Sequence, residues 1–352
     1  MNTHRIGSIA VRLSGLAFVA GLALAPAKSF ADAGGVSFWL PGLYGSLAAV
    51  PGQPGWSAGM IYYHTSVDAS GAAAASKQVE IGRFRPNVNV NLNVNLDARG
   101  DLVAFAPTYT FATPVFGGQL SVGLMSIYGR AETSLDGTLT ASLGPLTATR
   151  NGTLSDSTVG FGDLYPQATL KWNSGVHNFM TYVTGDIPVG DYDPNRLSNI
   201  GIGHGAIDGG LGYTYFDPTK GHEFSAVAGF TYNFRNPDTD YRNGVDFHLD
   251  WAASQWLSKQ FFVGVVGYAY QQLTADSGQP AILGPFKSRV FGIGPQIGYV
   301  FPANGMQGFL GLKSYFEFES ENRPEGWNAW VTLAFTPAEK PATAATRPMV
   351  RK

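Results

Sequence analysis

The chain has 352 residues, of which 14 % are charged and 13 % are aromatic, and it contains 45 glycines and no cysteine. Its mean hydropathy is near zero, so the low charge does not come from long apolar helices that cross a membrane. The lack of cysteine excludes disulfides, thiol catalysis and cysteine metal sites. Because the six histidines also have no metal-binding spacing, no metal or other cofactor is expected.

The first 31 residues are typical of a secretory signal peptide. Arg5 and Arg12 supply positive charge, residues 13–26 form an apolar core, and Ser29 and Ala31 are the small residues of a cleavage site. Removal of residues 1–31 takes away three basic residues and no acidic ones. The exported chain is therefore acidic, and nucleic acid is not an expected partner.

Residues 32–55 are rich in glycine and proline and show no sustained period. Two interpretations are open for this segment. It is either a periplasmic lead-in that lies against the mouth of the folded body, which is favoured, or a plug that enters that body.

Further along, apolar side chains alternate with small or polar ones in segments of about 10 to 16 residues. Aromatic residues such as Tyr232 and Phe234 gather near the segment ends, which is typical of membrane strands. A soluble sandwich would have shorter strands and more charge on its outer faces. The pattern predicts an all-β fold, an antiparallel transmembrane β-barrel over residues 56–335. The predicted strands are 56–67, 80–112, 119–133, 158–173, 176–187, 205–216, 222–233, 244–257, 260–272, 287–300, 306–319 and 326–335.

The segment 80–112 contains a shift of apolar phase. Apolar residues occupy even positions from Val88 to Leu96 and odd positions from Val103 to Phe111. Such a shift near a glycine indicates either a β-bulge or a turn. We favour a bulge at residues 97–101, because a turn there would require a further strand to keep the strand number even.

Connections between the segments alternate in length, as in outer-membrane barrels with short periplasmic turns and longer external loops. Both chain ends then lie in the periplasm, and the count is about twelve strands, within a range of about ten to fourteen. The last strand ends in the aromatic Phe335, which the barrel-assembly machinery would recognise, and residues 336–352 are predicted to be a disordered tail. The predicted external loops are 134–157, 188–204, 234–243, 273–286 and 320–325.

If apolar positions face lipid, a set of polar residues lies on the inner face of the strands. Charges inside a narrow barrel must be paired or hydrated, because isolated buried charge is costly. The favoured role of this set is a structural network that braces the barrel, and the alternative is the polar wall of a permeation path. The lumen-lining candidates are Gln167, Thr169, Lys171, Asp208, Glu223, Asp246, His248, Asp250, Lys313, Tyr315 and Glu317.

No constellation indicates catalysis, so the chain is not expected to be an enzyme. A lipid-modifying enzyme would need His204 or His248 near a serine at the membrane rim, and no serine lies in a GxSxG motif. The glycine-rich stretch 199–210 is not followed by a helical pattern, which argues against a nucleotide site. Asp191 and Asp193 are better explained by a capped turn than by a calcium site.

Short motifs, in order along the chain, resemble a known outer-membrane family. They include GDL at residues 162–164, PVGDYD at 188–193, LSNIG at 197–201 and GVDF at 244–247. The chain is similar to the family named for the meta-pathway of phenol degradation, which is related in style to the long-chain fatty-acid transporter group. This resemblance implies an outer-membrane channel that takes up hydrophobic or aromatic small molecules, and it implies no catalytic residues.

The sequence thus favours a monomeric channel, surrounded by outer-membrane lipid, for passive uptake of such molecules. The external loops 134–157, 188–204 and 273–286 would capture the substrate. It would then pass through the lumen, or laterally through a gap in the wall, with residues 32–55 as the gate. A structural or adhesive barrel with a closed lumen is the alternative class. The candidates for capture are Tyr192, Ile282, Leu283 and Phe286.

Overall fold

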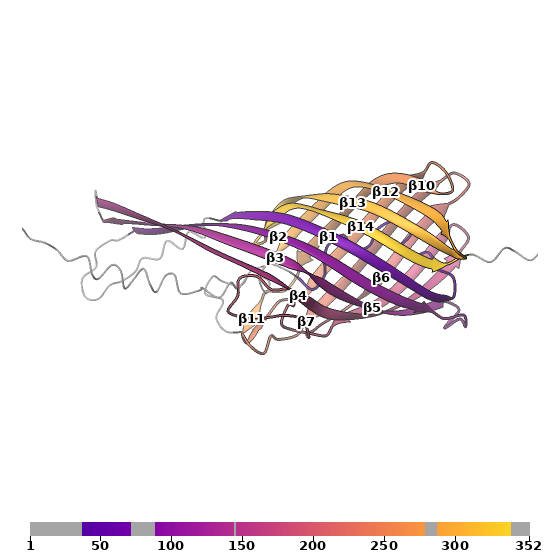
Figure 1. The fold of residues 1–352 in the computed structure, drawn as a ribbon, viewed down its shortest axis with the longest axis horizontal. Coiled ribbons are helices and arrows are strands. Elements are labelled where there is room, and N and C mark those ends of the chain that lie inside the picture. Colours follow the sequence, from indigo (N-terminus) through magenta and orange to yellow (C-terminus); the bar gives the residue numbers. More distant parts are fainter. Residues whose placement is uncertain (1–36, 72–88, 144–145, 279–286, 339–352) are drawn as a thin grey trace, which may run out of the picture.

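The computed structural model describes residues 37–71, 89–143, 146–278 and 287–338. They form a closed antiparallel barrel of twelve strands (Figure 1), so the predicted fold class and strand number are confirmed. Two further strands, β8 (Tyr241–Arg242) and β11 (Ser277–Gly278), pair with each other outside the barrel. Among the described residues, no helix has the length and apolar character needed to cross a membrane. The barrel strands are β1 (Gly55–Gly71), β2 (Asn89–Thr110), β3 (Gln119–Leu143), β4 (Leu146–Ser174), β5 (His177–Asp186), β6 (Ala206–Asp217), β7 (His222–Asn233), β9 (Asp246–Trp256), β10 (Phe261–Gln272), β12 (Arg289–Ala303), β13 (Met306–Glu321) and β14 (Glu325–Pro337).

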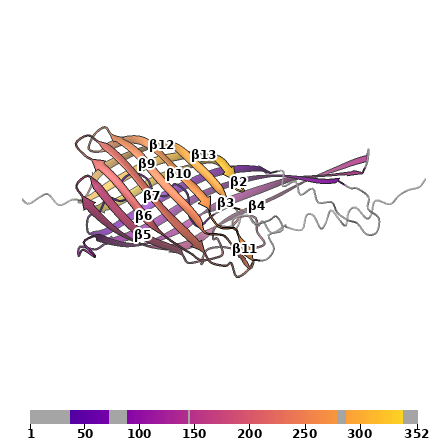
Figure 2. The same ribbon diagram turned by 180° about the vertical axis from the view of Figure 1, so that it is seen from behind.

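The two ends of the barrel differ. One end, here called the base, carries turns such as the one between β12 and β13, and the other, here called the mouth, carries the longest connections, such as the one between β5 and β6. Figure 2 shows β5, β6, β7, β9 and β10 as the slanted wall opposite β1 and β14. The chain closes on itself where β1 pairs with β14 from Ala58 to Asp68.

The outer surface of the barrel is an apolar band. Phe105, Leu211 and Phe230 are between 52 % and 70 % exposed. In water, apolar surface costs roughly 25 cal/mol per Å², so such a band is stable only against the hydrocarbon of a bilayer. Aromatic pairs flank the band, with Trp56 against Tyr109 near the base.

β2 is one unbroken strand, so the predicted bulge at residues 97–101 is wrong. Its pairing with β1 and β3 keeps one register through that stretch. The shift of apolar phase instead reflects a change of surroundings. The odd-numbered face is exposed throughout, apolar at Val103 and Phe105 where it meets lipid, and polar from Asp101 to Asn95 where it leaves the membrane.

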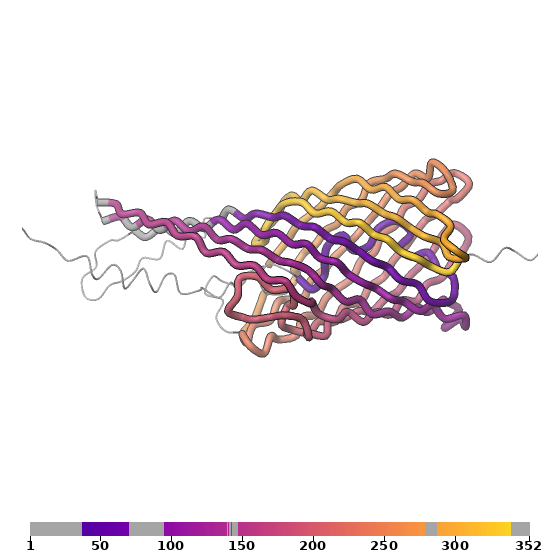
Figure 3. The backbone as a smooth tube through the Cα atoms, in the orientation of Figure 1, coloured from indigo at the N-terminus to yellow at the C-terminus, as the bar shows by residue number. Residues whose placement is uncertain are grey.

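The predicted external loop 134–157 is also wrong. β3 continues to Leu143, β4 starts at Leu146, and the two strands pair in one ladder along this whole stretch. Polar residues such as Ser134 and Asp136 occupy the outer face here. The strand therefore lacks the row of apolar residues by which the other membrane strands were predicted. Together with the upper parts of β1 and β2, these strands form a four-stranded sheet that extends beyond the mouth (Figures 1 and 3), here called the projecting sheet.

Residues 37–54, here called the plug segment, lie inside the barrel. They run from Ser37, which contacts the β13–β14 connection at the mouth, to Val50, which meets Lys171 near the base. The favoured prediction, that residues 32–55 lie against the mouth, is therefore wrong for this part of the segment. The alternative prediction, a plug that enters the barrel, is the correct one for it.

Other predicted boundaries fall partly outside the described residues. Residues 1–31, interpreted as the signal peptide, lie entirely outside the described residues. β14 ends at Pro337 rather than Phe335, and the remainder of the predicted tail, from residue 339, lies outside the described part.

Candidate permeation path through the barrel

The middle of the plug segment is held by one carboxylate and one ammonium group. The carboxylate of Asp250 on β9 accepts hydrogen bonds from the backbone N–H groups of Gly42 (2.9 Å) and Tyr44 (3.0 Å). Lys313 on β13 donates to the carbonyl oxygens of Gly42, Leu43 and Tyr44 at 2.5 to 3.2 Å. Irregular backbone inside a barrel has no ladder of its own, so it needs such partners.

Closer to the base, a cluster of polar side chains holds the next residues of the plug segment. The Glu223 carboxylate of β7 accepts hydrogen bonds from the Ser46 hydroxyl (2.7 Å) and from the N–H of Leu47 (3.0 Å). The Oγ atoms of Ser46 and Ser254 lie 2.6 Å apart. Gln296 of β12 donates to both of these hydroxyls at 2.8 Å. Strands β7, β9 and β12 therefore converge on one serine of the plug segment.

The end of the plug segment is bonded at the base. The N–H of Ala49 donates to the Thr214 hydroxyl of β6 at 3.0 Å, and Lys171 of β4 donates to the carbonyl of Val50 at 3.3 Å. The segment is thus bonded to the wall at three levels. A path can open only if these hydrogen bonds are exchanged for others, each worth about 0.5–1.5 kcal/mol net, or more where a charge takes part.

Nearer the mouth, Trp39 stacks on the ring of His248, with ring centroids 3.6 Å apart and planes at 13°. Nε2 of His248 lies 2.9 Å from Oδ2 of Asp208, and the Thr231 hydroxyl donates to the same oxygen. His248 and Asp208 are fully buried. A buried carboxylate requires such partners, and the indole of the plug segment covers the pair.

The remaining lumen candidates lie in more varied surroundings. Asp246 is buried and accepts a hydrogen bond from an asparagine amide of β7, and Glu317 accepts from a tyrosine of β10 and from a backbone N–H of β14. Tyr315 is buried, and its hydroxyl donates to a plug-segment carbonyl at 3.4 Å. Gln167 and Thr169 are half-buried on β4. The candidates that contact the plug segment are Lys171, Glu223, His248, Asp250, Lys313 and Tyr315.

The opposite wall of the lumen is apolar, and sequence reasoning missed it. Leu40 and Leu43 of the plug segment face this wall across a cavity of about 10 Å³. The rule that apolar positions face lipid failed because β1, β2 and β3 carry apolar residues on both faces inside the membrane. The phase shift in β2 was the available signal. The wall residues are Ile61, Tyr63, Leu102, Ala104, Met125, Ile127 and Trp330.

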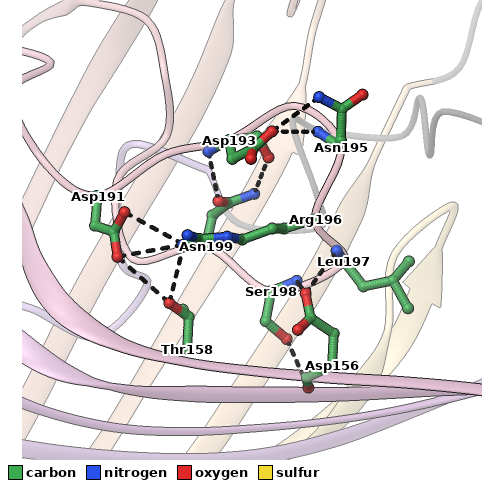
Figure 4. A network of polar contacts seen from close by, with 9 residues as sticks. All are labelled: Asp156, Thr158, Asp191, Asp193, Asn195, Arg196, Leu197, Ser198 and Asn199. Carbon is green, nitrogen blue, oxygen red and sulfur yellow. Dashed lines mark hydrogen bonds and ion pairs between the residues drawn. The ribbon is translucent and has the colours of Figure 1, made fainter.

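The β5–β6 connection docks against β4 at the mouth (Figure 4). Asp156 accepts hydrogen bonds from the N–H groups of Leu197 (3.0 Å) and Ser198 (3.2 Å). Asp191 pairs with Arg196 at 3.3 Å. These carboxylates therefore bind protein groups, and the bonds from Asp156 attach the loop to β4.

Three residues in this loop have shifted pKa values, and burial raises the pKa of the first of them, Tyr192. Hydrogen bonds from the backbone and side chain of Asn195 lower the pKa of Asp193, in keeping with the capped turn expected from the sequence. His204 is 2 % exposed, and burial lowers its pKa below the ordinary 6.5. The docked loop therefore favours a charged Asp193 and a neutral His204.

Of the predicted capture residues, only Tyr192 lies in the described part of the chain. Its side chain is half-buried, its ring packs over Gly203, and its hydroxyl accepts a hydrogen bond from Asn236 at 2.9 Å. Ile282, Leu283 and Phe286 lie outside the described residues.

These observations define the class of protein as a β-barrel of the outer-membrane type, with a lumen filled by its own N-terminal segment. A family model described as "Putative MetA-pathway of phenol degradation" matches residues 82–333, and the chain belongs to that family. The resemblance inferred from the short sequence motifs is therefore confirmed.

Solved structures share the architecture. An outer membrane channel from Pseudomonas putida F1 is 15 % identical, with a TM-score of 0.57, over 84 % of this chain and 98 % of that chain. A FadL homologue from Pseudomonas aeruginosa matches at 8 % identity and a TM-score of 0.36, over 80 % of this chain and 88 % of that one. The first likeness shows the fold alone, and the second is too distant to carry an argument. No curated protein matches the chain.

Proposed function

We propose that this protein is a channel of the bacterial outer membrane for passive uptake of hydrophobic or aromatic small molecules, gated by the plug segment. The observation that carries the proposal is the division of the lumen into two walls. One wall is polar and holds the backbone of the plug segment, and the other is apolar and is covered by Leu40 and Leu43.

This division suggests how passage would work. A hydrophobic solute gains free energy when it leaves water for an apolar wall. Movement of Leu40 and Leu43 away from β1, β2 and β3 would expose that wall, while the polar wall exchanges one set of hydrogen bonds for another. The gate is thus a change in which wall the plug segment contacts.

The proposed setting follows from the fold. Residues 1–31 would direct export, the barrel-assembly machinery would insert the chain, and the barrel would work as a monomer surrounded by outer-membrane lipid. We propose Tyr192, Ile282, Leu283 and Phe286 as the first contacts of the solute at the mouth.

Deletion of residues 37–50 tests the gate. In planar bilayers, the deletion variant is expected to show a larger and more steadily open single-channel conductance than the full chain, because the lumen loses the segment that fills it. Heat-modifiable migration on a gel provides the control that the variant barrel is folded. Identical traces for both proteins would refute gating by the plug segment.

A closed structural or adhesive barrel is the second candidate, favoured by the small size of the cavity beside the plug segment. The two functions separate in a liposome-swelling assay with phenol and with a sugar. A closed barrel admits neither solute, whereas the proposed channel admits phenol. No catalytic role is proposed, since the ring of His248 pairs with the Asp208 carboxylate and stacks on Trp39.

A further inference from the structure

The projecting sheet is far longer than a membrane requires. β4 alone has 29 residues, which at about 3.3 Å per residue is roughly 95 Å of strand. A bilayer core of about 30 Å needs only about 9–11 residues per tilted strand. The upper parts of β1–β4 therefore stand above the hydrocarbon, as Figure 3 shows for their extension past the mouth, and their side chains need another explanation than contact with lipid.

The outer face of this sheet is polar. Asp97, Arg99 and Glu132 occupy it, together with Ser134 and Ser155. They follow the lipid-facing positions of the same strands without a break in register. The outer face is thus built for a polar layer above the membrane, and the other face continues the wall of the lumen.

That lumen-side face carries a row of leucines, whereas the next row toward the barrel includes the polar Thr133 of β3 and Asp156 of β4. Leu96 of β2 pairs with Leu135 of β3, and Leu135 pairs with Leu154 of β4, so three leucines form one row across the sheet. Leu154 is 49 % exposed. One step nearer the barrel on the same face, Val67 of β1 pairs with Ala98 of β2.

The leucine row is continuous with the apolar wall of the lumen. Leu102 lies on the same face of β2 as Leu96, three alternate positions further down, and lines the cavity beside the plug segment. At the junction, Ile200 of the docked β5–β6 connection packs with Ile127 beside Gly162. On β1 and β2 the face therefore continues through Val67 and Ala98 to Leu102 beside Leu40 and Leu43, whereas on β4 Asp156 and Thr158 interrupt it.

Leu96 and Leu135 are half-buried and Leu154 is exposed, and this partial exposure has a cost, because apolar surface in water is unfavourable by roughly 25 cal/mol per Å². A contiguous apolar surface outside the membrane marks a binding surface. Its continuity with the lumen wall favours one kind of occupant, namely the molecule that the channel admits.

We propose that the lumen-side face of the projecting sheet is a loading track for uncharged aromatic or alkyl molecules, which it delivers to the apolar wall behind Leu40 and Leu43. This inference rests on the proposed channel function and assigns the substrate's entry route and chemical class. A hydrophobic molecule held on the Leu96–Leu135–Leu154 row reaches the mouth by moving along the sheet rather than through water.

The chain has no cysteine, so single thiols can test each face. The variants L135C and S134C place a thiol on neighbouring residues of β3 that face opposite sides of the sheet. Each full-length variant in lipid nanodiscs is reacted with a maleimide, with and without naphthalene. At about four times the half-protecting concentration, naphthalene is expected to slow labelling of L135C about fivefold and to leave S134C unchanged.

Equal labelling rates of L135C with and without naphthalene would overturn the track. Rapid disulfide formation between two L135C chains would also overturn it, by assigning the row to contact between copies of the protein. Heat-modifiable migration shows that both variants are folded.

A transport measurement separates this inference from the channel function itself. The triple variant L96Q/L135Q/L154Q is expected to slow naphthalene uptake about tenfold, whereas S134Q/S155Q on the outer face leaves uptake unchanged. If the unmodified protein takes up naphthalene but naphthalene does not slow labelling of L135C, the loading track is overturned and the channel function is kept. If naphthalene slows labelling of L135C but the unmodified protein takes up no naphthalene, the loading track is kept and the channel function is overturned.

Discussion

Lys313 and Asp250 show why a narrow barrel contains charged residues. Neither side chain is left to water, since Asp250 accepts from two N–H groups of the plug segment and Lys313 donates to three of its carbonyls. From the strand phase, both were predicted to point into the lumen. Their partners could not be predicted, because Lys313 and Gly42 are 271 positions apart and the plug segment has no period that would place it.

Replacement of Lys313 by methionine is expected to loosen the plug segment. Hydrogen bonds that involve a charged group contribute about 1.5–3 kcal/mol each, so the occluded state should lose a few kcal/mol and the channel should open more often. Single-channel recordings of K313M measure this change. K259M, in the exposed turn between β9 and β10, is the matched control, and an unchanged open probability in K313M would contradict the assigned role.

His204 predicts a pH dependence of the docked β5–β6 connection. Burial lowers its pKa below 6.5, so the undocked loop takes up a proton near that pH, whereas the docked loop resists it. Docking is therefore unaffected above about pH 6.5 and weakens as the pH falls below it, by at most about 1.4 kcal/mol per unit. Asp163 opposes part of this effect because its charge favours the protonated ring.

Hydrogen exchange of residues 187–205 measures this dependence, after correction for the intrinsic effect of pH on exchange. Opening is expected to be more frequent at about pH 5.5 than at about pH 7.5. H204N, which stays neutral, should abolish the difference, and an equal difference in H204N would show that another group is responsible.

At the scale of the element, β2 shows what an apolar period can and cannot report. Its alternation correctly predicted one strand, but the phase shift at residues 97–101 was interpreted as a bulge. The alternation of apolar and polar residues shows which face of a strand meets an apolar medium. For the outer face of β2, that medium changes from lipid to water where the strand leaves the membrane at Asp101. The same change hid the upper parts of β3 and β4, which were predicted to be loop, because their outer face meets no lipid.

The plug segment depends on a backbone conformation that only glycine adopts easily. Gly42 has a φ of +87°, and a Cβ atom there would lie 2.7 Å from the ring of Tyr315. G42A is therefore expected to displace the plug segment and raise the conductance. G52A is the matched control, since a Cβ at Gly52 meets nothing within 4 Å. Equal conductance of the two variants would show that the segment tolerates the change.

At the scale of the whole molecule, strand number and closure could be predicted from the sequence because parity, two-faced strands and connection lengths all constrain them. The polar wall could be placed for the same reason. The apolar wall could not be placed, because nothing in the sequence distinguishes lumen-facing apolar residues such as Ile61 and Leu102 from lipid-facing ones. The molecule joins a polar wall that holds the plug segment to an apolar wall that continues into the projecting sheet.

A reversible lock on the plug segment tests the central claim most directly. The Oγ atoms of Ser46 and Ser254 are 2.6 Å apart, so the double variant S46C/S254C in this cysteine-free chain places two thiols within reach of a disulfide. Naphthalene uptake into proteoliposomes is measured before and after reduction, with each single variant as a control. The proposed gate predicts that the oxidised protein blocks uptake and that reduction restores it. Equal uptake in the oxidised and reduced protein would contradict it.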